Sequence, residues 1–181
     1  MALCARSILP LGETTMNLYL IRHAIAVEED PSGEDSQRPL TEKGVKKMRQ
    51  IAKGLRTLGV EFDLILTSPY TRARQTADIL GDVFRLKKEI LISANLSPMG
   101  DPDLLLAEIN EKYKADSLAL VGHEPYLSAL VSLLVTGGAP VEMTFKKGGV
   151  CRLSADDLHH TRRATLEWLL TPGVLVEIGD R

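Results

Sequence analysis

The clearest guide to the architecture is Leu18-Tyr19-Leu20-Ile21-Arg22-His23-Ala24, where four apolar residues run directly into an arginine and a histidine. A short apolar run of this kind is typical of a buried strand in a sheet that is covered on both faces. Ligands of such sheets bind outside the carboxyl ends of the strands, so this strand delivers a guanidinium and an imidazole to that edge. The pair indicates an enzyme that handles phosphoryl groups.

Two further apolar runs end in the same way. Phe62–Thr67 runs into Ser68-Pro69-Tyr70-Thr71-Arg72, and Leu118–Val121 runs into Gly122-His123-Glu124-Pro125. Strand and helix patterns alternate along this part of the chain, which predicts an α/β fold with a mostly parallel central sheet and helices on both faces. We therefore expect all three junctions to open at one edge of one sheet.

Local signals predict the remaining elements. The expected helices are Glu42–Leu58 with Thr41 as N-cap and Gly59 as stop, Pro69–Phe84 with Ser68 as N-cap, Pro102–Lys112, and Pro125–Leu134. The expected strands besides the three above are Ile90–Ile92, Val141–Phe145, Gly149–Leu153 and Ala164–Leu169, the last two joined by a polar turn around Ser154–Arg163. Glu28–Asp35 is polar and predicts a loop on the rim of the site.

Composition limits the classes of protein that the chain can belong to. With 181 residues, 44% hydrophobic and 25% charged, it can bury one core and is expected to form a single soluble domain. Its net charge of -2 provides no general attraction for nucleic acid or an anionic membrane. No segment is long enough to span a membrane. We expect a cytoplasmic protein without a nucleic-acid or membrane partner.

The first fifteen residues make a poor signal peptide, because Arg6 is their one cation and Ser7 and Pro10 interrupt the apolar runs. We expect the domain to span residues 16–181 from Met16, with residues 1–15 a disordered extension or an artefact of the assigned start. The alternative is a genuine ordered arm. Cys4 and Cys151 lack metal-ligand spacing, so free thiols in a reducing compartment are expected rather than a disulfide.

The four basic side chains at these junctions fit a phosphoryl site when they are considered together. Arg72 in the first turns of a helix opposes the macrodipole, and a bound anion would reverse that penalty. Taken singly, Arg72 is as well explained by a surface ion pair, and His23 and His123 by structural hydrogen bonds. Together with Arg22 they would neutralise a dianion and supply a nucleophile. A neutral imidazole of His23 attacking phosphorus would give a phosphoenzyme, stabilised by Arg22, Arg72 and His123.

At these residues the chain resembles the histidine phosphatase superfamily, and within it the SixA-type phosphohistidine phosphatases. The resemblance rests on Leu20–Ala24, Arg38–Gly44, Ser68–Thr76, Val121–Pro125, Leu96–Asp101 and Leu166–Pro172, and covers nearly everything after Met16. It implies a phosphoglycerate mutase-like three-layer sandwich. Between the Arg72 helix and the His123 strand lie only residues Arg85–Ser117, which are too few for a large lid, so we expect an open site. The resemblance also implies that His23 is the phosphorylated nucleophile and that Arg22, Arg72 and His123 complete the phosphate pocket.

One feature of many relatives that act on phosphoesters is missing. No residue clearly replaces their glutamate general acid, and Asp101 is the nearest candidate for an acid or a substrate-binding group, although Asp101 before Pro102 also suits a helix start. Glu124 or the Glu28–Asp35 loop could also approach a leaving group. Lys146-Lys147 and His159-His160 are expected in a solvated turn and at an exposed hairpin tip, without a ligand constellation around them.

The resulting hypothesis is a phosphatase that needs no metal or cofactor and acts on a phosphohistidine protein through a phosphohistidine at His23. Two alternatives stay open. The same chemistry could serve a small phosphoester or a sugar phosphate, or the domain could be a non-catalytic phosphate-binding scaffold.

Overall fold

The computed structural model of the chain describes residues 15–28, 33–155, 158 and 163–181. The expectations for residues 1–14, which include Cys4, and for His159-His160 fall outside the described residues. A six-stranded sheet forms the centre of the molecule, in the order β3-β2-β4-β1-β5-β6. Its strands are β1 (Met16–Arg22), β2 (Leu64–Thr67), β3 (Ile90–Ile92), β4 (Ser117–Gly122), β5 (Val150–Ala155) and β6 (Thr165–Leu170). The predicted α/β fold with a mostly parallel sheet is confirmed.

The strand order brings the three predicted junctions together. β4 lies between β1 and β2 and pairs parallel with both, with Arg22 opposite Gly122 and Thr67 opposite Val121. β3 continues the parallel set beside β2, whereas β5 runs antiparallel to β1 and to β6. The carboxyl ends of β2, β4 and β1 are therefore neighbours at one edge of the sheet.

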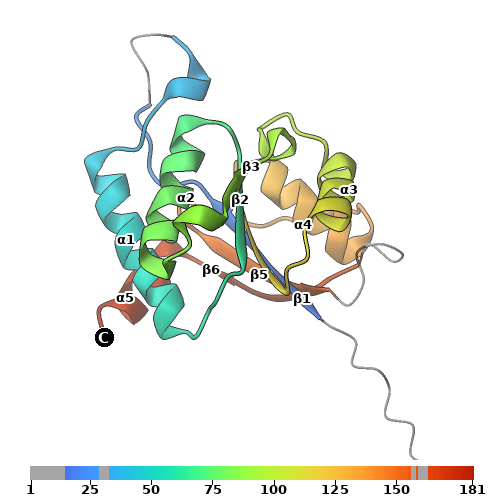
Figure 1. The fold of residues 1–181 in the computed structure, drawn as a ribbon. Helices are drawn as coiled ribbons and strands as arrows, with labels where there is room; N and C mark the ends of the chain where they lie inside the picture. Colours follow the sequence, from blue (N-terminus) through green and yellow to red (C-terminus); the bar gives the residue numbers. More distant parts are fainter. Residues whose placement is uncertain (1–14, 29–32, 156–157, 159–162) are drawn as a thin grey trace, which may run out of the picture.

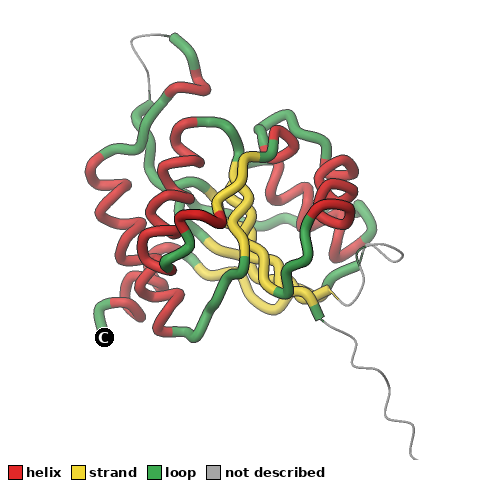
Figure 2. Tube along the Cα trace, viewed as in Figure 1, coloured by secondary structure: helices red, strands yellow, loops and turns green. Residues whose placement is uncertain are grey.

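Helices cover both faces, as the two views show (Figures 1 and 2). α1 (Glu42–Thr57), α2 (Thr71–Phe84) and α5 (Pro172–Gly179) pack on one face, and α3 (Pro102–Lys112) and α4 (Tyr126–Thr136) on the other. A hydrophobic core lies on each face of the sheet, and alternate residues of β1 contribute to the two cores. Leu18 and Leu20 face α3 and α4, while Tyr19 and Ile21 face α1 and α2. The result is a three-layer sandwich.

The start of α1 supports the site directly. Thr41 caps the helix as predicted, because its Oγ1 accepts from the Gly44 N–H at 3.0 Å, and the Thr41 N–H donates to the Ile25 carbonyl at 3.0 Å. A Cβ at Gly44 would stand 2.1 Å from that same carbonyl oxygen. Glycine is therefore needed for α1 to approach the segment that follows His23. At the other end, Gly59 adopts the left-handed conformation of a helix stop, with φ +74°.

The prediction of a strand at Val141–Phe145 is wrong. Its odd-numbered side chains do face inward, and Met143 and Phe145 pack against the core of α3 and α4. The segment nevertheless joins no strand, because β5, the strand that follows it, is already paired on both sides by β1 and β6. Side chains bond its backbone instead: the Val141 N–H donates to Ser132 Oγ at 3.1 Å, and the Phe145 carbonyl accepts from Arg22 Nη1 at 2.6 Å.

Two other details differ from the sequence prediction. Ser68 does not cap α2, whose N-cap is Tyr70, and the Ser68 side chain points to His123. The C-terminal helix α5 was not predicted, although Thr171 before Pro172 is a start signal of the kind seen at Asp101 before Pro102. None of the helices in the described part of the chain is long and apolar enough to cross a membrane.

Candidate active site

The first residue after each of three neighbouring strands carries a side chain into the site. These residues are His23 after β1, Ser68 after β2 and His123 after β4. The His23 N–H donates to the Gly122 carbonyl at 3.0 Å, and the Ser68 N–H donates to the Val121 carbonyl at 3.0 Å. Both bonds extend the parallel pairing by one residue, so the sheet itself fixes where these side chains begin.

Arg72 reaches the same place from the first turn of α2. Its Nε donates to His23 Nε2 at 3.3 Å, and its guanidinium carbon lies 4.9 Å from the centre of the Tyr70 ring. The centres of the His23 and His123 rings are 5.1 Å apart. Arg22 lies close enough for its charge to lower the pKa of both imidazoles. The structure thus places Arg22, His23, Arg72 and His123 in one cluster.

The hydrogen bonds of His23 define which nitrogen is free to react. Nδ1 lies 2.8 Å from the carbonyl oxygen of Ala24, which can only accept, so Nδ1 carries the proton. Nε2 accepts from Arg72 and therefore bears a lone pair. The Ala24 backbone is itself held by Thr76, whose Oγ1 accepts from the Ala24 N–H at 3.1 Å. Nε2 is consequently the ring nitrogen that carries the lone pair.

His123 has one fixed nitrogen and one open nitrogen. Nε2 lies 2.8 Å from Ser68 Oγ, which also accepts from the Tyr70 N–H at 3.3 Å. Nδ1 is buried without a hydrogen-bond partner among the described residues, and the same is true of Arg22 Nε. Buried polar atoms are normally hydrogen-bonded, so two such atoms beside one nucleophile indicate a place for a ligand with acceptor oxygens.

Both imidazoles are neutral at pH 7. Burial lowers the pKa of His23 to about 4, and the charges of Arg72, Arg22 and Lys147 add to the effect while the Ala24 carbonyl opposes it. Burial likewise lowers the pKa of His123 to about 3, with His23, Arg72 and Arg22 contributing and Asp35 opposing. A neutral His23 is the form that can attack an electrophile.

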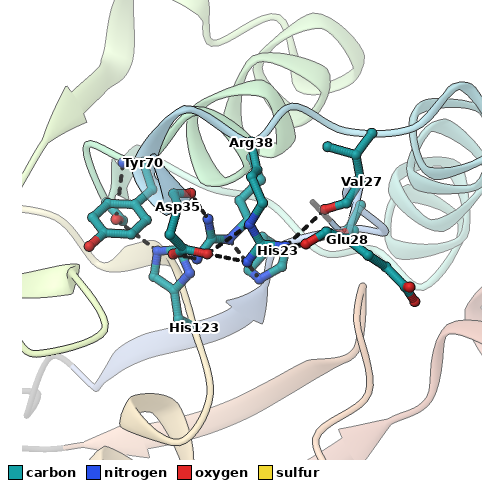
Figure 3. A network of polar contacts seen from close by, with 10 residues as sticks. His23, Val27, Glu28, Asp35, Arg38, Tyr70 and His123 are labelled. Atoms are coloured by element: carbon teal, nitrogen blue, oxygen red, sulfur yellow. Dashed lines mark hydrogen bonds and ion pairs between the residues drawn. The ribbon is translucent and has the colours of Figure 1, made fainter. Parts of the chain in front are cut away.

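A carboxylate from the Glu28–Asp35 loop enters the cluster (Figure 3). Asp35 begins the 3-10 helix η1 (Asp35–Gln37), and both its backbone oxygen and its Oδ2 accept from Arg72, at 2.6 and 2.9 Å. Its Oδ1 accepts from Arg38 Nε at 2.7 Å. Burial works to raise the pKa of Asp35, but its bonds to Arg72 and Arg38 outweigh that effect and leave the pKa below its ordinary value.

The loop before β5 completes the site from the other side. The Gly148 N–H donates to the carbonyls of Arg22 and His23, at 3.1 and 3.2 Å. Gly148 has φ +81°, a conformation that L side chains rarely adopt, so glycine is needed for this contact. The Phe145 carbonyl in the same loop holds Arg22 Nη1. Lys146 and Lys147 are exposed, as expected of a solvated turn.

The other candidate acids have structural contacts. Asp101 is exposed and caps α3, with Oδ1 accepting from the Asp103 and Leu104 N–H groups at 2.8 and 3.3 Å. Glu124 lies before the start of α4, and its carboxylate accepts from the N–H and Oγ of Ser128 at 3.0 and 2.6 Å. Neither carboxylate is hydrogen-bonded to the cluster within the described structure. The acid role of Asp101 stays a prediction without a supporting contact.

Sequence reasoning missed Ser68 and the part played by Asp35. Ser68 could have been found, because it follows β2 in the same way that His23 follows β1. It was assigned to the helix cap instead, since Ser-Pro is a common helix start. The sequence predicts that the loop containing Asp35 lies on the rim and could approach a leaving group, but it does not predict the contact of Asp35 with Arg72.

Comparison with known proteins shows the family of the chain. The profile of the histidine phosphatase superfamily (branch 1) matches residues 18–98. An uncharacterized protein of a Picosynechococcus species is 38% identical over 141 residues, which make up 76% of this chain and 84% of that protein. The phosphohistidine phosphatase SixA of Escherichia coli K12 is 29% identical over 159 residues, covering 87% of this chain and 94% of SixA.

A solved structure extends the likeness to three dimensions. The protein histidine phosphatase SixA complexed with tungstate matches with a TM-score of 0.75 at 30% identity, covering 88% of this chain and 99% of that one. The chain therefore belongs to the histidine phosphatase superfamily, a group of phosphatases. Within that superfamily its sequence and fold are of the SixA type.

Proposed function

We propose that the chain is a phosphohistidine phosphatase that works through a covalent phosphohistidine on Nε2 of His23. The observation that carries the proposal is the tautomer of His23: the Ala24 carbonyl holds the proton on Nδ1, so the lone pair of Nε2 faces the Arg72 guanidinium. This arrangement has a nucleophile and a cation side by side in a buried site. A scaffold that only bound phosphate would not need the nucleophile.

The reaction takes two displacements at phosphorus. In the first, Nε2 of His23 forms a bond to phosphorus while the bond from phosphorus to the substrate nitrogen breaks, and the departing imidazole takes up a proton. In the second, water attacks phosphorus, the bond to Nε2 breaks, and inorganic phosphate leaves. In the transition states negative charge is spread over the three equatorial oxygens of the transferring group, where Arg22 and Arg72 stabilise it.

The two unpartnered buried atoms support an oxyanion in this site. Arg22 Nε is a donor in every state. His123 Nδ1 is a donor when Ser68 Oγ gives its hydrogen to Nε2, which places the ring proton on Nδ1. A phosphoryl group would bond to both atoms. The tungstate in the SixA structure is also a tetrahedral oxyanion, which agrees with this choice of ligand.

The leaving group favours a phosphoramidate substrate. General acid catalysis contributes about 10²–10⁴-fold when a poor leaving group has to be protonated. In the described structure the carboxylates of Asp101 and Glu124 accept hydrogen bonds from N–H groups at helix starts, and neither is hydrogen-bonded to the cluster. An imidazole leaves from its labile P–N bond with less help than an alkoxide needs. A phosphohistidine on another protein is accordingly the proposed substrate, and the relative named phosphohistidine phosphatase agrees with it.

The first test separates nucleophile, substrate and scaffold. The wild type should turn over a phosphohistidine protein with a higher kcat/KM than sugar phosphates or phosphoserine peptides, and His23→Ala should be inactive but folded. Mass spectrometry after an acid-free quench should locate phosphate on His23. Phosphate found only on another residue would reject the mechanism, and efficient turnover of a small phosphoester alone would reject the substrate.

A matched pair of variants tests the arginine. Arg72→Ala should lose activity, whereas Arg74→Ala on the exposed face of the same helix should keep it. Equal activity of the two variants would show that Arg72 does not contribute to catalysis.

We also propose that no metal takes part, because Arg22 and Arg72 supply the positive charge. Among the described residues, no group of three or more histidine, cysteine or acidic side chains is placed to hold a metal ion. Activity should survive incubation with EDTA. Loss of activity that a divalent metal restores would instead indicate a metal-assisted hydrolase.

A further inference from the structure

The reactive side chains are covered in this structure. His23 is 6% exposed, Arg72 4% and His123 2%. A phosphoryl group must touch all three, so something has to move before a substrate can bind. The cover over Arg72 is identifiable, because the backbone oxygen and the carboxylate of Asp35 bond to both of its Nη atoms.

The segment Glu34–Arg38, which we call the strap, carries this cover. Arg38 fastens it: its Nε and Nη2 donate to Asp35 Oδ1, and its Nη1 donates to the carbonyls of Val27 and Glu28 at 2.8 and 3.2 Å. The Asp35 side chain is nevertheless 56% exposed. The carboxylate end of this ion pair is therefore open to solvent, while the Arg72 end is buried, and a ligand can compete for Arg72 from the solvent side.

We infer that Asp35 is a specificity-determining residue, an internal anion that holds Arg72 until the oxygens of a phosphoryl group replace it. The inference rests on the proposed function only in that the site takes a phosphoryl group. Carboxylate and phosphoryl oxygens compete for the same guanidinium donors, and two anions beside each other repel. Asp35 therefore weakens the binding of every simple oxyanion, including the phosphate product. A protein substrate has further contacts with which to displace it.

Binding of tungstate, measured by calorimetry, tests the exchange without any turnover. In Asp35→Asn the charge that competes for Arg72 is gone, so the dissociation constant should fall roughly fivefold. Asp82→Asn is the matched control. Asp82 is also an exposed-surface carboxylate paired with two cations, Arg49 and Lys87, and its substitution changes the net charge equally. Its tungstate affinity should equal that of the wild type.

Two results with these variants would overturn the inference. Equal tightening in both would show a general charge effect. Weaker tungstate binding in Asp35→Asn would show that Asp35 orients the Arg72 guanidinium for the ligand and does not compete with the ligand for it.

Hydrogen exchange on the unmodified protein provides a second measurement that needs no variant to fold. The N–H groups of Gln37 and Arg38 bond within the strap, to the carbonyls of Glu34 and Asp35 at 3.0 and 3.4 Å. Saturating tungstate should speed their exchange, because the strap has to leave Arg72. Unchanged or slower exchange would contradict the inference. If the tungstate results are as expected but the wild type turns over no phosphohistidine protein, the inference stands and the proposed substrate fails.

Discussion

Ser68 shows how one buried hydroxyl can set the state of a reactive ring. It is fully buried, accepts from the Tyr70 N–H and lies 2.8 Å from His123 Nε2. Because its oxygen already accepts one bond, its hydrogen is available for the ring nitrogen. When the hydroxyl donates to Nε2, the proton of His123 is on Nδ1, the nitrogen that has no partner among the described residues. We expect Ser68 to act on the phosphoryl group through His123.

The substitution Ser68→Ala should lower kcat about tenfold or more with a smaller change in KM, because the donor tautomer of His123 is no longer selected. Ser93→Ala is a suitable control. Ser93 is also a buried serine just after a strand, but its Oγ donates to Glu108 at 2.6 Å. That variant should lose stability and keep its kcat. Steady-state kinetics on both variants test this prediction. If Ser68→Ala has the same kcat as Ser93→Ala, Ser68 has only a structural role.

At the scale of elements, the sequence predicted what local patterns determine. β1, β2 and β4 are buried on both faces, so each is a continuous apolar run, and the position of His23 and His123 follows from where those runs stop. Thr41 and Gly59 mark the ends of α1 by backbone requirements that operate locally. The central part of the candidate site was predictable for the same reason.

Which segments pair as strands of the sheet was harder to predict. Val141–Phe145 has the alternation of a strand, with its odd-numbered residues partly or fully buried, yet it pairs with no strand of the sheet. Periodicity shows which side chains face inward, but it does not show what the backbone bonds to.

The strap was beyond local reasoning. Asp35 and Arg72 are 37 positions apart, and their contact depends on how a short 3-10 helix sits over α2. A polar stretch with proline and glycine predicts only a loop. The sequence therefore predicts a place on the rim for its carboxylate, whereas in the structure the carboxylate is bonded to Arg72.

At the scale of the whole molecule, the buried histidines of the site lower the stability of the fold by an amount that depends on pH. The fold keeps His23 and His123 neutral in a buried site, with pKa values of about 4 and about 3 against 6.5 for an exposed histidine. Below pH 6.5 the unfolded chain binds protons that the folded chain does not. Stability therefore falls as pH decreases from 6.5, and it continues to fall until the pH nears the folded-state values.

Each histidine should contribute up to about 1.4 kcal/mol per pH unit to this loss. In His123→Gln the free energy of unfolding should consequently decline less steeply between pH 6.5 and 5 than in the wild type, by about that amount per unit. Urea denaturation at pH 7, 6 and 5 measures both slopes. The comparison cancels the other titrating groups, including His159 and His160, because both proteins contain them. Parallel slopes would mean that His123 takes up its proton in the folded protein, and a neutral His123 could then not be part of the resting site.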